Sequence, residues 1–194
     1  LGLVGAKGDL VLTTKASHEQ GGASLQECKS GVFELDKPSR TIIFHNVEER
    51  PAPSVLRGFS APVKLELDTS AEDLQTLAAR DSDLFNRWQA IQTSATRLLI
   101  GYVSTIRSGG VPGADARICE ALGNVLGAFA SDPAFTAQAI SLPAESDIAR
   151  EIASDVDPDA VHLARRELRR TLGATLQGQL LQVYEALATD APYS

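Results

Sequence analysis

The sequence predicts an α+β fold, in which an N-terminal partial antiparallel β-sandwich is followed by an all-α domain of stacked antiparallel helices. Before residue 50, apolar residues alternate with polar ones or form short runs between turn residues, which is typical of strands. After Asp68 they recur at the spacing of amphipathic helices. Residues 50–68 separate the two patterns, and their three prolines hold the backbone extended or turned and exclude a helix. We therefore expect two domains, residues 1–68 and 69–194.

About five short strands are expected in the first domain. Each is an apolar or alternating run bounded by turn residues, and the last one alternates Val63, Leu65 and Leu67 with charged side chains, as in a half-buried strand. Residues 15–26 contain two adjacent glycines and several polar residues, so we expect a loop there. Five strands are few for a closed Ig-like sandwich and enough for part of one. The expected strands cover residues 1–5, 10–14, 32–35, 41–44 and 61–68.

The second domain is expected to be helical throughout. Ser70 and Asp157 stand where helix N-caps are expected, and Asp157 precedes a proline at the first helical position. The last helix has an aliphatic stripe whose exposure would cost roughly 1.5–3 kcal/mol for each side chain, so it must pack against other helices. The expected helices are a short one after Ser70, then residues 84–106, 115–130, 133–140, 145–154 and 158–188.

Charge and composition exclude several classes of function. The chain of 194 residues has a net charge of −7, and residues 69–194 hold ten basic against sixteen acidic side chains. An acidic helical half argues against nucleic acid or an anionic membrane as the main partner. The sequence has no apolar run long enough to span a membrane and no basic-then-apolar leader. It also lacks Met, and we interpret it as a piece of a longer protein with exposed apolar surface at its first strand and along its last helix.

The two cysteines are expected to be free thiols. Cys28 and Cys119 stand far apart in the sequence, and no C-x-x-C motif is present. Such a pair in an otherwise ordinary chain is more typical of buried thiols in a reducing compartment than of a disulfide.

The histidines offer little support for a metal site. His18-Glu19 begins like the motif H-E-x-x-H, but Gly22 stands where the second histidine should be. His45 precedes two glutamates at the end of a predicted strand, where this spacing does not align side chains. His162 lies near the start of the last helix, and we expect it to be solvated. Surface or hydrogen-bonded histidines are the simpler interpretation.

Other polar and aromatic groups also favour structural roles. Four arginines on the last helix form two rows, which we interpret as a solvated or interdomain face rather than an anion site. Three aspartates before that helix lack the glycine and final glutamate of a calcium loop and are expected to be caps. Phe85 and Trp88 belong to the apolar stripe of the long helix and are expected in the core. The glycines of residues 109–113 lack the context of a phosphate-binding loop. The arginines are Arg165, Arg166, Arg169 and Arg170, and the aspartates are Asp155, Asp157 and Asp159.

One stretch of the junction carries a specific resemblance to a known family. Residues 54–66, SVLRGFSAPVKLE, closely resemble a signature segment of bacterial aminopeptidase N, the zinc-dependent, thermolysin-like alanyl aminopeptidase family. Residues 83–88, DLFNRW, resemble the first long helix after that segment. Residues 142–143 and 157–158 fit the family's short connector and its entry to a long helix. The resemblance extends over nearly the whole chain.

The resemblance implies which part of such an enzyme this chain matches. It looks like the latter part of a small β-sandwich and the first part of the helical C-terminal domain that closes over the active site. The family binds zinc through H-E-x-x-H and a later Glu, holds the peptide amino terminus with G-A-M-E-N, and stabilises the transition state with a tyrosine. Residues 113–117 share only two letters with G-A-M-E-N, and the other motifs have no counterpart. We therefore expect no catalytic, metal-binding or substrate-binding residue here.

Two functions follow as alternatives. By resemblance, the parent is a cytoplasmic zinc aminopeptidase acting on peptides, and this piece is an inactive, cofactor-free link between its catalytic domain and its helical domain. Its partners are then the remaining domains of the parent, with no nucleic acid and no membrane, and self-association through cut faces is left open. Alternatively, the chain is a stand-alone protein-interaction module without a peptidase parent. An H-E-x-x-H motif upstream would distinguish the two.

Overall fold

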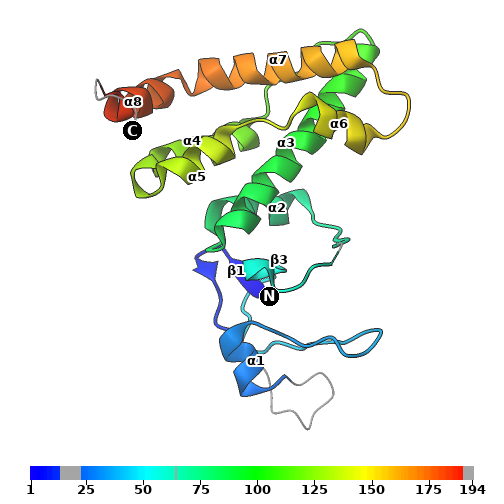
Figure 1. Cartoon of the computed structure of the whole chain (residues 1–194), viewed down its shortest axis with the longest axis vertical. Coiled ribbons are helices and arrows are strands. Elements are labelled where there is room, and N and C mark those ends of the chain that lie inside the picture. The colour runs from blue at the N-terminus through cyan, green and yellow to red at the C-terminus, as the bar shows by residue number, and fades with distance from the viewer. Residues whose placement is uncertain (14–22, 64, 190–194) are drawn as a thin grey trace. The chain divides into compact units, whose positions relative to one another are not determined.

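The computed structural model in Figure 1 describes residues 1–13, 23–63 and 65–189. The chain forms two compact units, Leu1–Ala90 and Ile91–Ser194. The predicted order of an antiparallel sheet followed by helices is confirmed. The proposed domain boundary between residues 68 and 69 stays a prediction.

The sheet of the first unit has three short antiparallel strands in the order β2-β1-β3. β1 (Gly2–Gly5) pairs with β2 (Gly8–Asp9) and, on its other side, with β3 (Ala52–Ser54). The strand predicted at residues 10–14 is wrong over the described residues 10–13, because the chain turns back earlier and β2 occupies residues 8–9. β1 is buried along its whole length. The expectation that the first strand exposes apolar surface is wrong, because β1 lies at the centre of the sheet and contacts α2 (Ala71–Arg80).

Three further predicted strands are also not strands in the residues that the structure describes. Residues 32–35 and 41–44 are irregular, and Phe33 contacts Phe44 edge-on with ring centroids 5.8 Å apart. Residues 61–63 and 65–68 are also irregular, and their alternating apolar side chains stay exposed. Alternation alone does not make a strand, because a neighbouring strand must supply the hydrogen bonds.

The loop expected at residues 15–26 is only partly testable, since residues 14–22 lie outside the described chain. Its last residues begin α1 (Leu25–Ser30), which the sequence interpretation missed. Ser24 and Glu27 form a capping box at its start, in which each side chain accepts a hydrogen bond from the other residue's backbone N–H.

The junction is extended at β3 but turns immediately after it. Arg57–Phe59 form a 3₁₀ turn, so the expectation that this stretch contains no helix is wrong there. Leu56, Gly58 and Phe59 have positive φ angles of 55°, 62° and 55°. A left-handed conformation is uncommon for leucine and phenylalanine, so other contacts must hold this turn in place.

The predicted start of the first helix after the junction is confirmed. Ser70 caps α2 by accepting a hydrogen bond from the backbone N–H of Asp73 at 3.1 Å. The helix packs against β1 and β3 through a buried apolar face. The core of the first unit contains Leu3, Val4, Ala52, Leu74, Leu77 and Ala78.

The predicted helices between residues 84 and 154 are confirmed with small shifts of their ends. α3 (Leu84–Arg107) begins in the first unit and continues into the second. A short 3₁₀ turn, Phe129–Ser131, separates the two helices that follow it. The second unit also contains α4 (Ala116–Gly127), α5 (Pro133–Ile140), α6 (Glu145–Ile152), α7 (Pro158–Thr175) and α8 (Gln177–Leu187).

Helices of the second unit pack in neighbouring pairs. α4 contacts α5 and α8, and α7 contacts α6 and α8 (Figure 1). Asp132 and Asp157 cap α5 and α7, and each is followed by proline at the first helical position. The most deeply buried side chains of this unit include Ile91, Leu99, Leu126, Ile148, Val161 and Leu168.

The final predicted helix is wrong in one respect, because it breaks into α7 and α8 at Leu176. Gly173 and Gly178 flank this break, and glycine weakens a helix through its backbone freedom. α8 carries several exposed apolar side chains, so the expected apolar surface along the end of this region is confirmed. These side chains are Leu181, Tyr184 and Leu187.

Neither cysteine enters a disulfide. Cys28 is half-buried in α1, and Cys119 is buried in α4. The prediction that the two residues are not joined to each other is confirmed.

Candidate functional site

The histidines do not assemble a metal site in the residues that the structure describes. His18 lies outside them. The backbone N–H of His45 donates to the carbonyl oxygen of Thr13 at 2.8 Å. His162 is exposed, with Nδ1 3.0 Å from Oε1 of Glu145. Over residues 1–13, 23–63 and 65–189, no group of three His, Cys, Asp or Glu side chains could hold a metal ion.

The three aspartates before α7 have separate structural roles. Asp157 accepts a hydrogen bond from the backbone N–H of Ala160 at 3.0 Å and caps the helix, as predicted. Asp159 lies in the first turn, where a negative charge favours the helix dipole. Asp155 is not a cap but forms an ion pair with Arg107 at 2.5 Å.

Two of the four arginines on α7 bind other groups of the protein through their side chains. Arg165 donates from Nε to the carbonyl oxygen of Pro143 at 2.9 Å. Arg170 forms an exposed ion pair with Glu167 on the same helix. The remaining two arginines of the rows have no hydrogen bond or ion pair among the described residues: Arg166 and Arg169.

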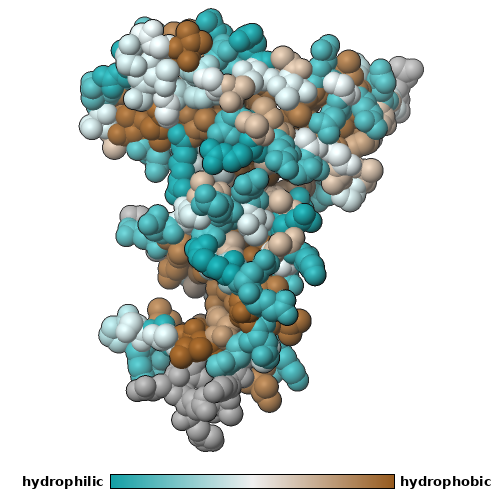
Figure 2. Space-filling model, turned by 180° about the vertical axis from the view of Figure 1, so that it is seen from behind, coloured by the Kyte–Doolittle hydropathy of each residue, from teal (hydrophilic) through white to brown (hydrophobic). Residues whose placement is uncertain are grey.

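An aromatic cluster reaches the surface beside the junction. Phe59 and Phe85 have ring centroids 4.7 Å apart, and Phe85 lies 5.6 Å from Trp88. Phe59 is 73% exposed and Phe85 is 41% exposed, so the prediction that Phe85 belongs to the core is wrong. Phe85 lies at the start of α3 and packs on the ring of Phe59, which belongs to the 3₁₀ turn. Figure 2 shows that hydrophobic residues reach the surface in patches on the face it displays.

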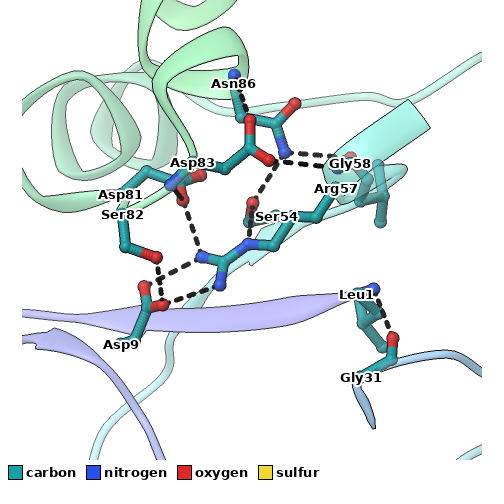
Figure 3. A network of polar contacts seen from close by, with 11 residues as sticks. Leu1, Asp9, Gly31, Ser54, Arg57, Gly58, Asp81, Ser82, Asp83 and Asn86 are labelled. Atoms are coloured by element: carbon teal, nitrogen blue, oxygen red, sulfur yellow. Dashed lines mark hydrogen bonds and ion pairs between the residues drawn. The ribbon is translucent and has the colours of Figure 1, made fainter. Parts of the chain in front are cut away.

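The first unit has an arginine at the centre of a polar network, drawn in Figure 3. The two terminal nitrogens of Arg57 donate to the two carboxylate oxygens of Asp9 at 2.7 and 2.9 Å. Nη2 also donates to Oδ1 of Asp81 at 2.7 Å, and Nε donates to Oγ of Ser54 at 2.7 Å. One side chain therefore contacts β2, β3 and the turn between α2 and α3.

A second layer of hydrogen bonds fixes the partners of Arg57. Ser82 donates from its hydroxyl to Asp9 at 2.6 Å. The backbone N–H of Gly58 donates to Asp83 at 3.1 Å, which holds the strained turn. Asn86 donates from its amide to Ser54 Oγ at 2.8 Å and to the carbonyl oxygen of Val55 at 3.0 Å (Figure 3).

Charge pairing in the network shifts the acid–base equilibria of its members. The hydrogen bond from Arg57 lowers the pKa of Asp9 below its ordinary value, and burial opposes this only in part. The same hydrogen bond raises the pKa of Arg57. Asp81 is fully buried, and its Oδ2 atom has no hydrogen-bond partner among the described residues. The charge of Arg57 therefore compensates a carboxylate that water does not reach.

Two further features tie the junction to its surroundings. Arg50, just before β3, binds both carboxylate oxygens of the buried Asp73 on α2 at 2.6 and 2.8 Å. This hydrogen bonding lowers the pKa of Asp73. Gly2 lies directly against the guanidinium, since a Cβ atom at this position would stand 2.2 Å from Cζ of Arg57. A side chain at position 2 would therefore have to displace the guanidinium from its present place.

The network connects segments that are distant in sequence through hydrogen bonds and ion pairs. All three nitrogens of the Arg57 guanidinium already donate to protein oxygens. The arrangement pairs no hydroxyl or thiol nucleophile with a basic histidine. Its groups suit the positioning of backbone segments, not proton transfer or nucleophilic attack.

Sequence reasoning identified this stretch but missed the role of its arginine. Arg57 stands within the segment that carries the family resemblance, whereas Asp81, Ser82 and Asp83 lie between two predicted helices, where polar residues are expected as caps. A cluster of three polar residues between two helices is a weak signal, because caps explain it equally well. Arg57 donates hydrogen bonds to Asp81, 24 positions away, and to Asp9, 48 positions away. No local sequence pattern reveals contacts between residues so far apart.

A separate hollow lies within the second unit. Its walls come from α4, α5, α7, α8 and the connector that follows α5, and its volume is about 440 Å³. Aliphatic side chains form most of its surface, and Arg165 and Arg169 also line it.

Hydropathy gives no membrane-crossing segment, since none of the helices in the described ranges combines the length and apolar character required.

Comparisons with known proteins agree with the two-part organisation. Residues 7–68 match a family described as a domain of unknown function with an Ig-like fold. Residues 71–194 match a family described as a domain of unknown function with ARM repeats. These matches confirm the predicted fold class of an Ig-like portion followed by stacked helices.

The curated relatives are peptidases. The chain is 36% identical to aminopeptidase N of Caulobacter vibrioides over 162 residues, and 32% identical to aminopeptidase N of Escherichia coli over 157 residues. These matches cover 82% and 81% of this chain but 18% of each relative, so the chain spans less than a fifth of their length. The crystal structure of Legionella pneumophila aminopeptidase A in complex with aspartic acid has a similar fold. Its TM-score is 0.59 at 22% identity, covering 77% of this chain and 17% of that one.

Proposed function

Because the chain belongs to the family of the ARM-repeat domain matched over residues 71–194 and corresponds to a segment of aminopeptidase N, we propose that it is a structural segment of a zinc aminopeptidase. The observation that carries the proposal is the similarity to these enzymes over four-fifths of the chain, combined with coverage of only 18% of their length. The proposed parent removes amino-terminal residues, alanine among them, from peptides in the cytoplasm.

Zinc belongs elsewhere in the proposed parent. The sequence has only three histidines and no H-E-x-x-H motif, so its residues do not fit a catalytic zinc centre, which usually needs three protein ligands. We propose that this chain has no catalytic, metal-binding or substrate-binding residue, and that it neither binds zinc nor hydrolyses peptides by itself.

The role that we propose for the segment is to fix the domains of the parent relative to one another. Arg57 joins two strands to the turn that begins α3, and this supports a rigid link at the start of the helical domain. The cluster of Phe59, Phe85 and Trp88, in which the two phenylalanines are exposed and the tryptophan is half-buried, lies beside that link and would contact another domain of the parent. Neighbouring apolar side chains that are exposed together commonly mark an interface.

Hydroxyl-radical footprinting tests this role. We expect Phe59 and Phe85 to be oxidised readily in the 194-residue chain and to be protected in an intact parent enzyme. Tyr184, exposed on α8, reports independently on the second unit. Equal oxidation of both phenylalanines in the two proteins would contradict the docking role. It would favour the alternative of a stand-alone interaction module, whose surface stays open for other partners.

A further inference from the structure

The hollow of the second unit has the size of a small-molecule site. Its volume of about 440 Å³ falls within the range of roughly 300–1,000 Å³ that is usual for such sites. The proposed structural role of the segment neither needs nor explains this cavity, which lies far from the Arg57 network in the sequence.

The wall of the cavity is suited to a hydrocarbon chain. Seven leucine and isoleucine side chains line it. Leu122 and Leu126 of α4 are buried. Leu172 of α7 is buried as well, and so is Leu176, which stands at the break between α7 and α8. Filling such a surface with an apolar chain removes hydrocarbon from water on both partners.

The polar lining is positive and lacks a counter-charge. Arg165 is fixed at the cavity by its hydrogen bond to the carbonyl oxygen of Pro143. Arg169, one turn later, also lines the cavity and has no hydrogen bond or ion pair among the described residues. Ser141 is the remaining polar side chain, and no acidic residue lines the hollow. The charge therefore complements an anion and offers nothing to an ammonium group.

We propose that this cavity binds a linear aliphatic monocarboxylate, with its hydrocarbon chain against the leucine wall and its carboxylate on Arg165 and Arg169. A planar guanidinium matches the two oxygens of a carboxylate. Free amino acids fit less well, because their ammonium group would meet the two arginines without an acidic partner.

Calorimetric titration of the 194-residue chain tests the proposed ligand class. The probes are decanoate, decanol and decylammonium, each below its micelle concentration. We expect saturable binding of one decanoate per chain, with decanol and decylammonium weaker by at least about tenfold, because they lack the charge-assisted hydrogen bonds. Equal affinity for the three probes would overturn the proposal.

Matched substitutions locate the carboxylate. Arg169→Gln should weaken decanoate binding by at least about tenfold, whereas Arg166→Gln, on the same helix but outside the cavity, should leave it unchanged. Both arginines are exposed, so neither change threatens the fold. Equal effects of the two substitutions would contradict the assignment, since a general loss of positive charge would then explain the result.

A second pair of substitutions tests the hydrocarbon part. Gly173 lines the cavity, and a Cβ atom there would have no neighbour within 4 Å. Gly173→Leu should therefore place a side chain in the hollow and weaken decanoate binding by at least about tenfold without unfolding α7. Gly178→Leu, on α8 and outside the cavity, also has space for a Cβ atom and serves as the control. Unchanged decanoate binding in a folded Gly173→Leu chain would overturn the proposal.

Sedimentation velocity addresses the other occupant that this surface could have, a second copy of the chain. If Gly173→Leu converts a dimer to a monomer and decanoate has no saturable site, the cavity is a self-association surface and the proposal fails. A chain whose mass is the same with and without the substitution, and which binds decanoate, supports it. Neither outcome affects the proposed peptidase parent, which rests on other observations.

Discussion

Arg57 joins β2, β3 and the turn before α3 within the first unit. Its guanidinium contacts Asp9, Ser54 and Asp81, and its side chain is 20% exposed while that of Asp81 is 0% exposed. Burying a carboxylate is costly unless a cation and hydrogen bonds compensate it. A lysine would retain the charge but could not supply donors in three fixed directions.

Replacing Arg57 should therefore destabilise the first unit. We expect Arg57→Met to lower its free energy of unfolding by about 3–5 kcal/mol, because Asp81 then stays buried without its cation. Urea denaturation followed by fluorescence measures this directly, since Trp88 is the sole tryptophan of the chain and belongs to the first unit.

Arg80→Met is the matched control, because Arg80 is exposed on α2 and has no ion pair among the described residues. Its loss should cost at most about 1 kcal/mol through the helix dipole. Similar midpoints for the two variants would show that the Arg57 network does not support the unit.

Glu27 provides a pH-dependent test at the same scale. The hydrogen bond from Arg40, followed by that from the backbone of Ser24, lowers the pKa of Glu27 from 4.5 to about 2. The folded state thus binds this proton less readily than the unfolded state, so the stabilisation is complete above about pH 4.5 and is lost as the pH falls towards 2. A ¹³C NMR titration should place the Glu27 midpoint near pH 2.

The partner of Glu27 supplies the comparison. In Arg40→Gln, the Glu27 midpoint should rise towards 4.5, because the largest cause of the shift is removed. An unchanged midpoint in this variant would contradict the assigned cause.

At the scale of elements, the helices were more predictable from the sequence than the strands. Caps such as Ser70, Asp132 and Asp157 and the apolar period of each helix are local features. The order and approximate bounds of α2 to α6 and the start of α7 therefore follow from the residues. The break at Leu176 was missed because the apolar stripe continues across it. The contacts of α8 with α4 and α7 show that residues 158–187 form two helices and not one continuous helix, and these contacts are not evident from the sequence.

Strands depend on partners that no local pattern specifies. β3 pairs with β1 across about fifty residues and contains Pro53, so neither its position nor its register was evident. Conversely, Val63, Leu65 and Leu67 alternate but remain exposed. The Arg57 network was unpredictable for the same reason, since its members come together only when the strands and α2 have formed.

Two helical glycines test how closely α4 and α8 approach. A Cβ atom at Gly178 would meet nothing within 4 Å, whereas one at Gly123 would lie 3.2 Å from the Gln179 side chain and 3.4 Å from Leu176. Replacement of a helical glycine by alanine contributes up to about 1 kcal/mol. We expect Gly178→Ala to raise the stability of the second unit by about that amount and Gly123→Ala to raise it less or lower it.

Thermal unfolding followed by circular dichroism measures both variants on the same helical signal. Equal stabilisation by the two alanines would contradict the close packing of α8 on α4.

At the scale of the whole molecule, the chain combines a sheet whose central strand is buried, a strained junction and a helical unit. The similarity to aminopeptidase N thus concerns a portion whose proposed task is to hold and position other domains. Its most specific segment, residues 54–66, contains the turn that Arg57 and Asp83 fix, which gives that segment a structural reason for its sequence.

The most direct test of this account measures zinc and peptidase activity in the purified 194-residue chain. Elemental analysis and hydrolysis of alanyl p-nitroanilide are carried out in parallel on this chain and on intact aminopeptidase N of Caulobacter vibrioides as the positive control. We predict no stoichiometric zinc and no hydrolysis by the chain, with both present in the intact enzyme. One tightly held zinc per chain, or turnover that a chelator abolishes, would contradict the assignment of the chain as a structural segment.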